Sequence, residues 1–224
     1  ALSMASKRMA SKNALIRNLE AVETLGSTNV ICTDKTGTIT QNKMKVTTLV
    51  LNNFEWSAYQ ADLTHAPGFK EAWMVMTLCN NARLSGKAFQ GDPTEGALLQ
   101  FAHPLKPFQT LFEQLPRVHE SPFDSSNKRM ITSHVDDAGV FWHYMKGAPE
   151  IIFEKCSLCW QASGIVEFDA GFRQVAEQIY QRLAARGERV LALAMKSSSG
   201  KTIGEEDFVF VGLVGMIDPP RPEI

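Results

Sequence analysis

The short apolar segment 29–33 and the residues that follow it constrain the fold of this chain more than any other feature. Segment 29–33 reads Asn-Val-Ile-Cys-Thr, and a continuous run of this kind is typical of a buried strand in a parallel sheet. Asp34 comes directly after it. The sequence therefore predicts a carboxylate at the carboxyl end of a strand, which is the edge where ligands bind in open α/β sheets.

The string Asp-Lys-Thr-Gly-Thr-Ile-Thr, residues 34–40, has a composition suited to phosphoryl chemistry. A carboxylate such as Asp34 can attack a phosphorus atom and carry the phosphoryl group as an aspartyl phosphate. Lys35 places a positive charge beside it, Thr36 supplies a hydroxyl, and Gly37 lets the backbone approach phosphate oxygens closely. A plain strand end followed by a glycine turn is the simpler interpretation, but the length of the string favours a phosphorylation site.

This string resembles the phosphorylation signature of the P-type ATPases, pumps that move cations through a phosphoenzyme cycle. The flanking segments 19–26 and 41–44 are similar to the subfamily of the calcium and sodium/potassium pumps. The resemblance implies Asp34, Lys35 and Thr36 as catalytic residues, with ATP as substrate and Mg²⁺ held at Asp34 and Thr36. It also implies transport of Ca²⁺ or another metal or alkali cation.

Composition separates this chain from several other classes. A chain of 224 residues with 44% hydrophobic residues fits one large or two small folded domains, and a net charge of -1 argues against nucleic acid as a partner. The longest apolar stretch, 208–217, is about half of what a bilayer span needs. Because a pump must cross a membrane, we expect a soluble piece from its cytoplasmic face. Its partners would be the membrane helices, the actuator domain and the rest of the phosphorylation domain.

The four cysteines include a single C-x-x-C at Cys156 and Cys159. A zinc site needs four ligands, and the sequence has no second C-x-x-C or H-x-x-x-H to complete one. Free thiols are therefore favoured over a metal or redox role.

Segment 91–96, Gly-Asp-Pro-Thr-Glu-Gly, resembles the P-type motif whose glutamate contacts the adenine side of the nucleotide. Asp92 at the N-cap, Pro93 in the first turn and Glu95 three residues after the cap are also a strong signal for a helix start. The two interpretations are compatible, and Glu95 is assigned to nucleotide binding.

Segment 121–130 resembles the family segment in which a phenylalanine stacks on adenine and a lysine lies close to the nucleotide. Phe123 offers a flat apolar face for the base, and Lys128 offers positive charge for ring nitrogens or phosphate. A core position is the alternative for Phe123. Ser125 stands where calcium pumps often carry an arginine, which removes one possible phosphate contact.

Three further motifs complete the predicted nucleotide site and its connection. Lys146 and Gly147 begin Lys-Gly-Ala-Pro-Glu, which resembles the nucleotide loop of the family, although a strand-end lysine is often merely solvated. Arg189 matches the phosphate-side arginine of the family, and a guanidinium suits phosphate because its donors form a rigid fork. Asp218 and Arg221 belong to Asp-Pro-Pro-Arg, which resembles the hinge that returns to the phosphorylation domain. All five are assigned to the cofactor-binding set.

A P-loop is rejected, although Ser-Gly-Lys-Thr at 199–202 ends like one. The pattern needs glycine five residues before Gly200, where the chain has Met195.

The resemblance implies an α/β (α+β) fold: a twisted antiparallel sheet flanked by helices, inserted in a truncated haloacid-dehalogenase-like domain. The expected domains are residues 1–43, the start of the phosphorylation domain with a stalk; 44–217, the nucleotide-binding domain; and 218–224, the returning hinge. Helices are predicted at 1–17, 70–83, from 92, from 149 and at 169–186, and strands at 129–135, 140–146, 189–195 and 208–217. In the family the neighbours of strand 29–33 come from sequence after Ile224, so we expect no complete doubly wound sheet and a poorly anchored segment 1–43.

Two other functions remain open at this stage. A haloacid-dehalogenase-like phosphatase shares the nucleophile strand, but it normally carries a second aspartate two residues later, where this chain has Thr36. A free-standing adenine-nucleotide sensor would leave the string at 34–40 without a purpose. The resemblance favours the pump.

Overall fold

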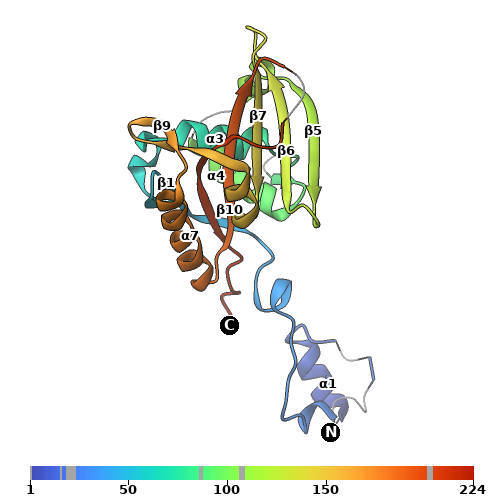
Figure 1. Ribbon diagram of the computed structural model, residues 1–224. Helices are drawn as coiled ribbons and strands as arrows, with labels where there is room; N and C mark the ends of the chain where they lie inside the picture. Colours follow the sequence, from blue (N-terminus) through green and yellow to red (C-terminus); the bar gives the residue numbers. More distant parts are fainter. Residues whose placement is uncertain (1, 16, 19–23, 86–87, 106–108, 201–203) are drawn as a thin grey trace. The chain divides into compact units, whose positions relative to one another are not determined.

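The computed structural model describes residues 2–15, 17–18, 24–85, 88–105, 109–200 and 204–224. The chain divides into two compact units, Ala1–Ile39 and Thr40–Ile224. Figure 1 shows the course of the chain through both. Each unit is described by itself.

The unit Ala1–Ile39 contains the helix α1 (Leu2–Ala10) and the single turn η1 (Lys35–Ile39). The predicted helix 1–17 is wrong in its extent, because α1 ends at Ala10 and Asn13 adopts a left-handed φ of 62°. Gly37 also has a positive φ, of 77°, so a glycine turn does follow Asp34.

The predicted strand at 29–33 is not formed. Residues 28–34 adopt neither helix nor strand, and the side chains of Val30 and Ile31 are 71% and 81% exposed. A parallel strand is stabilised by neighbours that pair with its backbone and cover both of its faces. Within Ala1–Ile39 the described residues include no strand that could supply this pairing, so apolar composition alone does not make residues 29–33 a strand.

The unit Thr40–Ile224 is built on a large sheet in which, among the described residues, seven strands follow the order β2-β1-β11-β10-β7-β6-β5. The strands are β1 (Lys45–Leu51), β2 (Phe54–Ser57), β5 (Arg117–Asp124), β6 (Arg129–Val135), β7 (Phe141–Gly147), β10 (Arg189–Ser198) and β11 (Phe208–Ile217). Every neighbouring pair in this order is antiparallel. The antiparallel sheet predicted from the sequence is confirmed.

One additional hairpin departs from that pattern. It consists of β8 (Cys156–Gln161) and β9 (Gly164–Glu167), and β8 pairs in parallel with β11 through Phe208 and Cys156. A separate small hairpin consists of β3 (Arg83–Ser85) and β4 (Ala88–Gln90). Neither hairpin was predicted, nor were the short helices η2 (Ala61–His65) and α5 (Gln109–Gln114).

Helices cover both faces of the large sheet. The core on one face includes residues of α3 (Phe69–Leu78) and α4 (Pro93–Leu105), and the core on the other includes residues of α6 (Pro149–Lys155) and α7 (Ala170–Ala185). Successive strand residues point to opposite faces. Accordingly Leu193 joins the first core while its neighbours Ala192 and Ala194 join the second. Two-sided coverage explains why β10 is apolar at every position from Val190 to Met195.

Local capping signals place the helix ends that matter for the site. The Oδ1 atom of Asp92 accepts hydrogen bonds from the backbone N–H groups of Thr94 and Glu95, at 2.8 and 3.2 Å, and so begins α4 as predicted. The same device begins α7, where Asp169 Oδ1 accepts from the N–H of Phe172 at 2.9 Å. Gly187, with φ of 79°, follows the end of α7.

The two segments that enter and leave the large sheet lie side by side. Thr40 forms a bridge with Pro220, and the N–H of Gln41 donates to the carbonyl of Pro219 at 3.0 Å. Asp218 joins them further, because its carboxylate accepts hydrogen bonds from the hydroxyl of Thr40 and from the N–H of Lys43. In the described parts of the chain, no helix combines the length and the apolar character that crossing a membrane requires.

Candidate functional site

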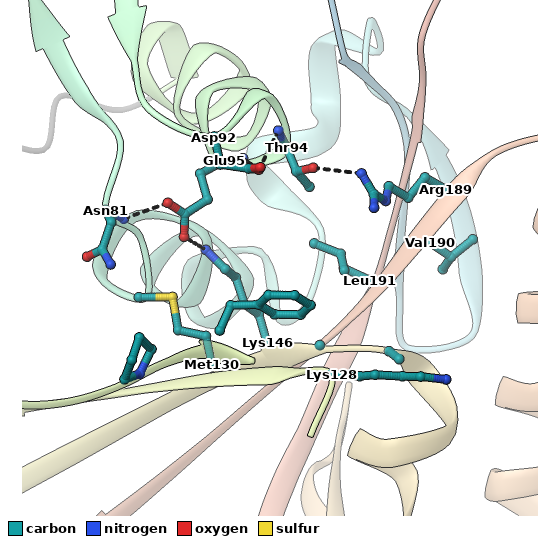
Figure 2. A pocket seen from close by; sticks show the side chains of 14 residues that line it. Asn81, Asp92, Thr94, Glu95, Lys128, Met130, Lys146, Arg189, Val190 and Leu191 are labelled. Carbon is teal, nitrogen blue, oxygen red and sulfur yellow. Dashed lines mark hydrogen bonds and ion pairs between the residues drawn. The ribbon is translucent and has the colours of Figure 1, made fainter. Parts of the chain in front are cut away.

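A cavity of about 510 Å³ opens where β7 ends and β10 begins. Six of the residues predicted to bind nucleotide line it: Glu95, Phe123, Lys128, Lys146, Gly147 and Arg189. They come from α4, the end of β5, the turn before β6, the end of β7 and the start of β10. The remaining lining residues are Asn81, Asp92, Thr94, Pro122, Met130, Ala148, Val190 and Leu191 (Figure 2).

The most buried polar group of the cavity is an ion pair between Glu95 and Lys146. Lys146 Nζ lies 2.6 Å from Glu95 Oε1, and the two side chains are only 6% and 13% exposed. The ammonium also donates to the carbonyl of Cys79 at 2.5 Å, and the N–H of Asn81 donates to Glu95 Oε2 at 3.1 Å. A buried pair persists when further hydrogen bonds satisfy both charges, as they do here.

This geometry decides between alternatives that the sequence left open. Lys146 is not a solvated lysine at a strand end, because it is buried against Glu95 and Cys79. Glu95 is not needed to cap α4, because Asp92 binds the free N–H groups of the first turn and the Glu95 carboxylate turns toward Lys146. Figure 2 shows the carboxylate between Asn81 and Lys146.

Phe123 lies at the cavity on the last residues of β5, with 61% of its surface exposed. The alternative that Phe123 belongs to the core is therefore wrong. The apolar side chains of Met130 and Leu191 line the same cavity. An exposed phenyl ring next to such side chains provides a surface on which a flat aromatic ligand can stack.

Lys128 and Gly147 meet at the turn between β5 and β6. Lys128 adopts a left-handed φ of 48°, and its Nζ lies 3.4 Å from Glu150 Oε1 in a pair that is about half exposed. Asp124 shapes the turn, and hydrogen bonds from the N–H and hydroxyl of Ser126 lower the pKa of its carboxyl. In Figure 2 the Lys128 side chain extends away from Glu95 and Lys146.

Gly147 is required by a close approach of the chain to itself. A Cβ atom at this position would lie 2.5 Å from the carbonyl oxygen of Lys128 and 2.9 Å from the Cα of Arg129. The space beside Gly147 is therefore occupied by the backbone of Lys128 and Arg129. Gly147 still borders the cavity through its backbone.

Arg189 is hydrogen-bonded to the start of α4. Its Nη1 donates to the hydroxyl of Thr94 at 3.1 Å, the contact that Figure 2 marks with a dashed line. Arg189 is the first residue of β10 and one of the lining residues. Its remaining donors suit an anion in the cavity.

The other predicted site residues lie elsewhere. Asp34, Lys35 and Thr36 belong to the unit Ala1–Ile39, where Asp34 is exposed and its Oδ1 accepts from the N–H of Lys35 at 2.7 Å. Asp218 and Arg221 are not among the residues that line the cavity, and Asp218 instead joins the two connecting segments.

Sequence reasoning missed Asn81, which binds Glu95 through its backbone. The sequence placed Asn81 inside the predicted helix 70–83, but α3 ends at Leu78 and leaves Asn81 in the turn that follows. Cys156 and Cys159 are buried free thiols, and burial raises the pKa of both. The described residues contain no group of three or more His, Cys, Asp or Glu side chains placed to hold a metal ion.

An exposed phenyl ring, a buried ion pair and an arginine around one cavity, on a helix-flanked antiparallel sheet, define a domain with a candidate ligand-binding site. The family model described as the cytoplasmic N domain of P-type ATPases matches residues 68–223. The chain therefore belongs to the P-type cation ATPase family.

Individual relatives agree with this assignment. Calcium-transporting ATPase 1 of Lactococcus lactis is 40% identical over 230 aligned positions, which cover all of this chain and 26% of the relative. The sodium/potassium-transporting ATPase alpha subunit of Drosophila melanogaster is 37% identical, and subunit alpha-4 of Homo sapiens is 36% identical, each over 257 positions and 25% of the relative. The chain spans about a quarter of the length of these curated relatives.

Proposed function

We propose that this chain is the ATP-binding part of an ATP-driven cation pump, and that the cavity of the Thr40–Ile224 unit receives the adenine nucleotide. The observation that carries the proposal is the convergence of Glu95, Phe123, Lys146 and Arg189 on one cavity from four separate segments. The names of the relatives support a pump of Ca²⁺ or of alkali cations.

Five of the lining residues have a role in this proposal. Phe123 stacks on the face of the base, and the buried Glu95–Lys146 pair recognises the polar edge of the base. Lys128 and Arg189, which are the more accessible cations, face the phosphates. Binding through an aromatic face and a buried polar pair favours adenine over guanine, because the two bases present different donors and acceptors at their edges.

In the intact pump we propose that a carboxylate oxygen of Asp34 attacks the γ-phosphorus of ATP, that the bond from this phosphorus to the β–γ bridging oxygen breaks, and that ADP leaves while Asp34 carries the phosphoryl group as an aspartyl phosphate. The carboxylate of Asp34 and the hydroxyl of Thr36 are hard oxygen donors that fit Mg²⁺. When bound, Mg²⁺ would neutralise phosphate charge there. Lys35 adds positive charge next to the nucleophile.

The proposed domain layout follows from these roles. Residues 1–43 and 218–224 form parts of a haloacid-dehalogenase-like phosphorylation domain with a stalk, and 44–217 form the nucleotide-binding domain inserted in it. The partners are the membrane helices, the actuator domain and the rest of the phosphorylation domain. The parent protein lies in a membrane with this part on its cytoplasmic face.

Titration of the chain with ATP tests the nucleotide site. We expect saturable changes in the NMR signals of the cavity residues and weaker changes with GTP. Replacing Phe123 by alanine should weaken ATP binding by roughly 1–3 kcal/mol, by analogy with base–aromatic stacking. Phe54→Ala is the matched control, since Phe54 is 66% exposed on β2 outside the cavity lining. Equal effects of the two substitutions, or equal responses to ATP and GTP, would contradict the proposal.

A further inference from the structure

The backbone that ends α3 lies between two groups of charged side chains. On one side it binds the cavity pair, because the Cys79 carbonyl accepts from Lys146 Nζ at 2.5 Å and the Asn81 N–H donates to Glu95 at 3.1 Å. On the other side it binds Arg117, whose Nη2 donates to the carbonyls of Leu78 and Asn80 at 2.8 and 2.6 Å. Along the chain, Leu78 and Asn80, whose carbonyls bind Arg117, therefore alternate with Cys79 and Asn81, which bind the ion pair.

Arg117 is held in turn by a small polar network. Its Nη1 donates to Asn81 Oδ1 at 2.5 Å and to Glu120 Oε2 at 2.9 Å, and Asn81 Nδ2 donates to Glu120 Oε1 at 2.6 Å. The hydrogen bond from Asn81, opposed by burial and assisted by Arg117, lowers the pKa of Glu120. Arg117 and Glu120 are only 26% and 29% exposed.

The physical reason for this arrangement is the end of the helix. The last carbonyls of a helix have no partner within it and carry partial negative charge, so they attract cations. Lys146 binds the carbonyl of the C-cap residue Cys79, and Arg117 binds those of Leu78, the last residue of α3, and Asn80, the residue after the cap. The planar fork of a guanidinium can reach two carbonyls and two side chains at once, which a single ammonium cannot.

Arg117 is separated from the nucleotide cavity itself. It is absent from the lining of that cavity and borders a second one of about 890 Å³, together with Asn80, Leu84, Phe112 and Glu120. Asn81 lines both cavities. Residues 78–81, which contact both Arg117 and the ion pair, connect Arg117 to the first cavity more directly than β5 does, where Phe123 lies six positions after Arg117.

We infer that Arg117 is a positioning residue of the nucleotide site: it fixes the turn that ends α3, so that Cys79 and Asn81 hold Lys146 and Glu95 in place. The inference rests on the proposed function of the cavity. Glu120 and the Asn81 side chain complete the network that orients Arg117.

The test compares Arg117→Met and Arg117→Lys with Arg182→Met in the full 224-residue chain. Arg182 is the matched control, because it makes an ion pair with Glu55 on α7 and β2 outside the cavity lining. We expect Arg117→Met to raise the Kd for ATP by about tenfold, the lower end of what loss of an outer-shell partner costs at other sites. Arg117→Lys should recover part of that loss, and Arg182→Met should leave the Kd within about twofold, as expected for an exposed ion pair.

A double-substitution cycle separates positioning from general stability. If Arg117 acts through Asn81 and Glu95, Arg117→Met should add little to the loss of affinity already caused by Glu95→Gln. Additive losses would overturn the inference, and so would a lowered Tm with an unchanged Kd, because Arg117 would then be a helix cap only. Should Arg117→Met fail to fold, the same cycle is carried out with Arg117→Lys.

A measurement without nucleotide distinguishes failure of this inference from failure of the proposed function. In the nucleotide-free chain, Arg117→Lys should shift the NMR signals of the Asn81 amide and the Lys146 ammonium, whereas Arg182→Met should not. Unshifted signals would overturn the positioning role even if the wild type binds ATP. Absence of ATP binding by the wild type would overturn the proposed function while shifted signals still support the role of Arg117.

Discussion

Replacing Glu95 by alanine should destabilise the protein far more than breaking an ion pair at the surface. Glu95 is 13% exposed and, among the residues that the structure describes, is the only carboxylate in an ion pair with Lys146, which is 6% exposed. Removing one partner of a buried pair costs about 3–5 kcal/mol, because the remaining charge is left uncompensated. The carbonyl of Cys79 still accepts from Lys146, so we expect the lower end, about 3 kcal/mol.

The matched comparison is Glu150→Ala, which breaks the pair between Lys128 and Glu150. Those side chains are 54% and 48% exposed and lie 3.4 Å apart, so the expected cost is at most about 1 kcal/mol. Lys146→Met combined with Glu95→Gln should cost clearly less than the sum of the two single substitutions, because no unpaired charge remains buried.

Urea unfolding followed by circular dichroism measures these differences as shifts in the midpoint at constant m. Repeating the titrations in 0.5 M salt should reduce the small Glu150 effect and leave the Glu95 effect nearly unchanged, since buried pairs are screened much less than exposed ones. Equal costs for the two substitutions, or a fully additive double variant, would refute the argument that burial of the Glu95–Lys146 pair sets its energetic role.

Three further predictions address other parts of the molecule. Burial, opposed by a hydrogen bond to the Leu115 carbonyl, lowers the pKa of His134 from 6.5 to about 4, so the unfolded chain takes up a proton at a higher pH than the folded chain does. Urea titrations should therefore show that the protein loses about 2 kcal/mol of stability between pH 7 and pH 5, and His134→Leu should not show this loss. Gly147→Ala should lower stability by about 1–3 kcal/mol because of its clash with the backbone of Lys128 and Arg129, whereas Gly96→Ala, inside α4 where the new Cβ would lie 3.7 Å from Phe89 Cβ, should raise it by up to about 1 kcal/mol. After incubation with γ-labelled ATP, the wild type should carry no more acid-stable label than Asp34→Asn, because Asp34 is exposed on an irregular segment and lacks the preorganised surroundings that phosphoryl transfer needs.

The sequence predicted those elements whose signals are local. The start of α4 was identified from Asp92 and Pro93, and α7 from Asp169, Gly187 and the periodic apolar residues between them. Both ends depend on side chains that bind the backbone a few residues away, so the necessary information lies within one short window.

Elements that depend on distant partners were missed or wrong. The apolar run 29–33 was predicted as a strand, but pairing neighbours, which a local pattern does not contain, decide whether such a run becomes one. The parallel pairing of β8 with β11 joins Cys156 to Phe208, which are far apart in the sequence, and no periodicity of either strand indicates it. The same limit applies to the domain order, which was inferred from resemblance.

The site divides in the same way. Glu95, Phe123 and Lys146 were identified because each stands in a recognisable motif, and the structure brings them to one cavity. Asn81 and Arg117 were missed because they act through backbone atoms of residues 78–81, and hydrogen bonds of this kind leave no residue pattern.

The pairing of Thr40 with Pro220 has a consequence for how such a unit can be exchanged between proteins. The Thr40–Ile224 sheet begins and ends at neighbouring points, with Asp218 joined to both Thr40 and Lys43. Paired strands lie about 5 Å apart. A host domain can therefore accept the whole unit in one surface loop whose two ends are separated by about that distance. Inserting residues 40–220 into a tight turn of an unrelated scaffold should therefore leave both folds intact, so this part of the chain can be transferred between proteins as a unit.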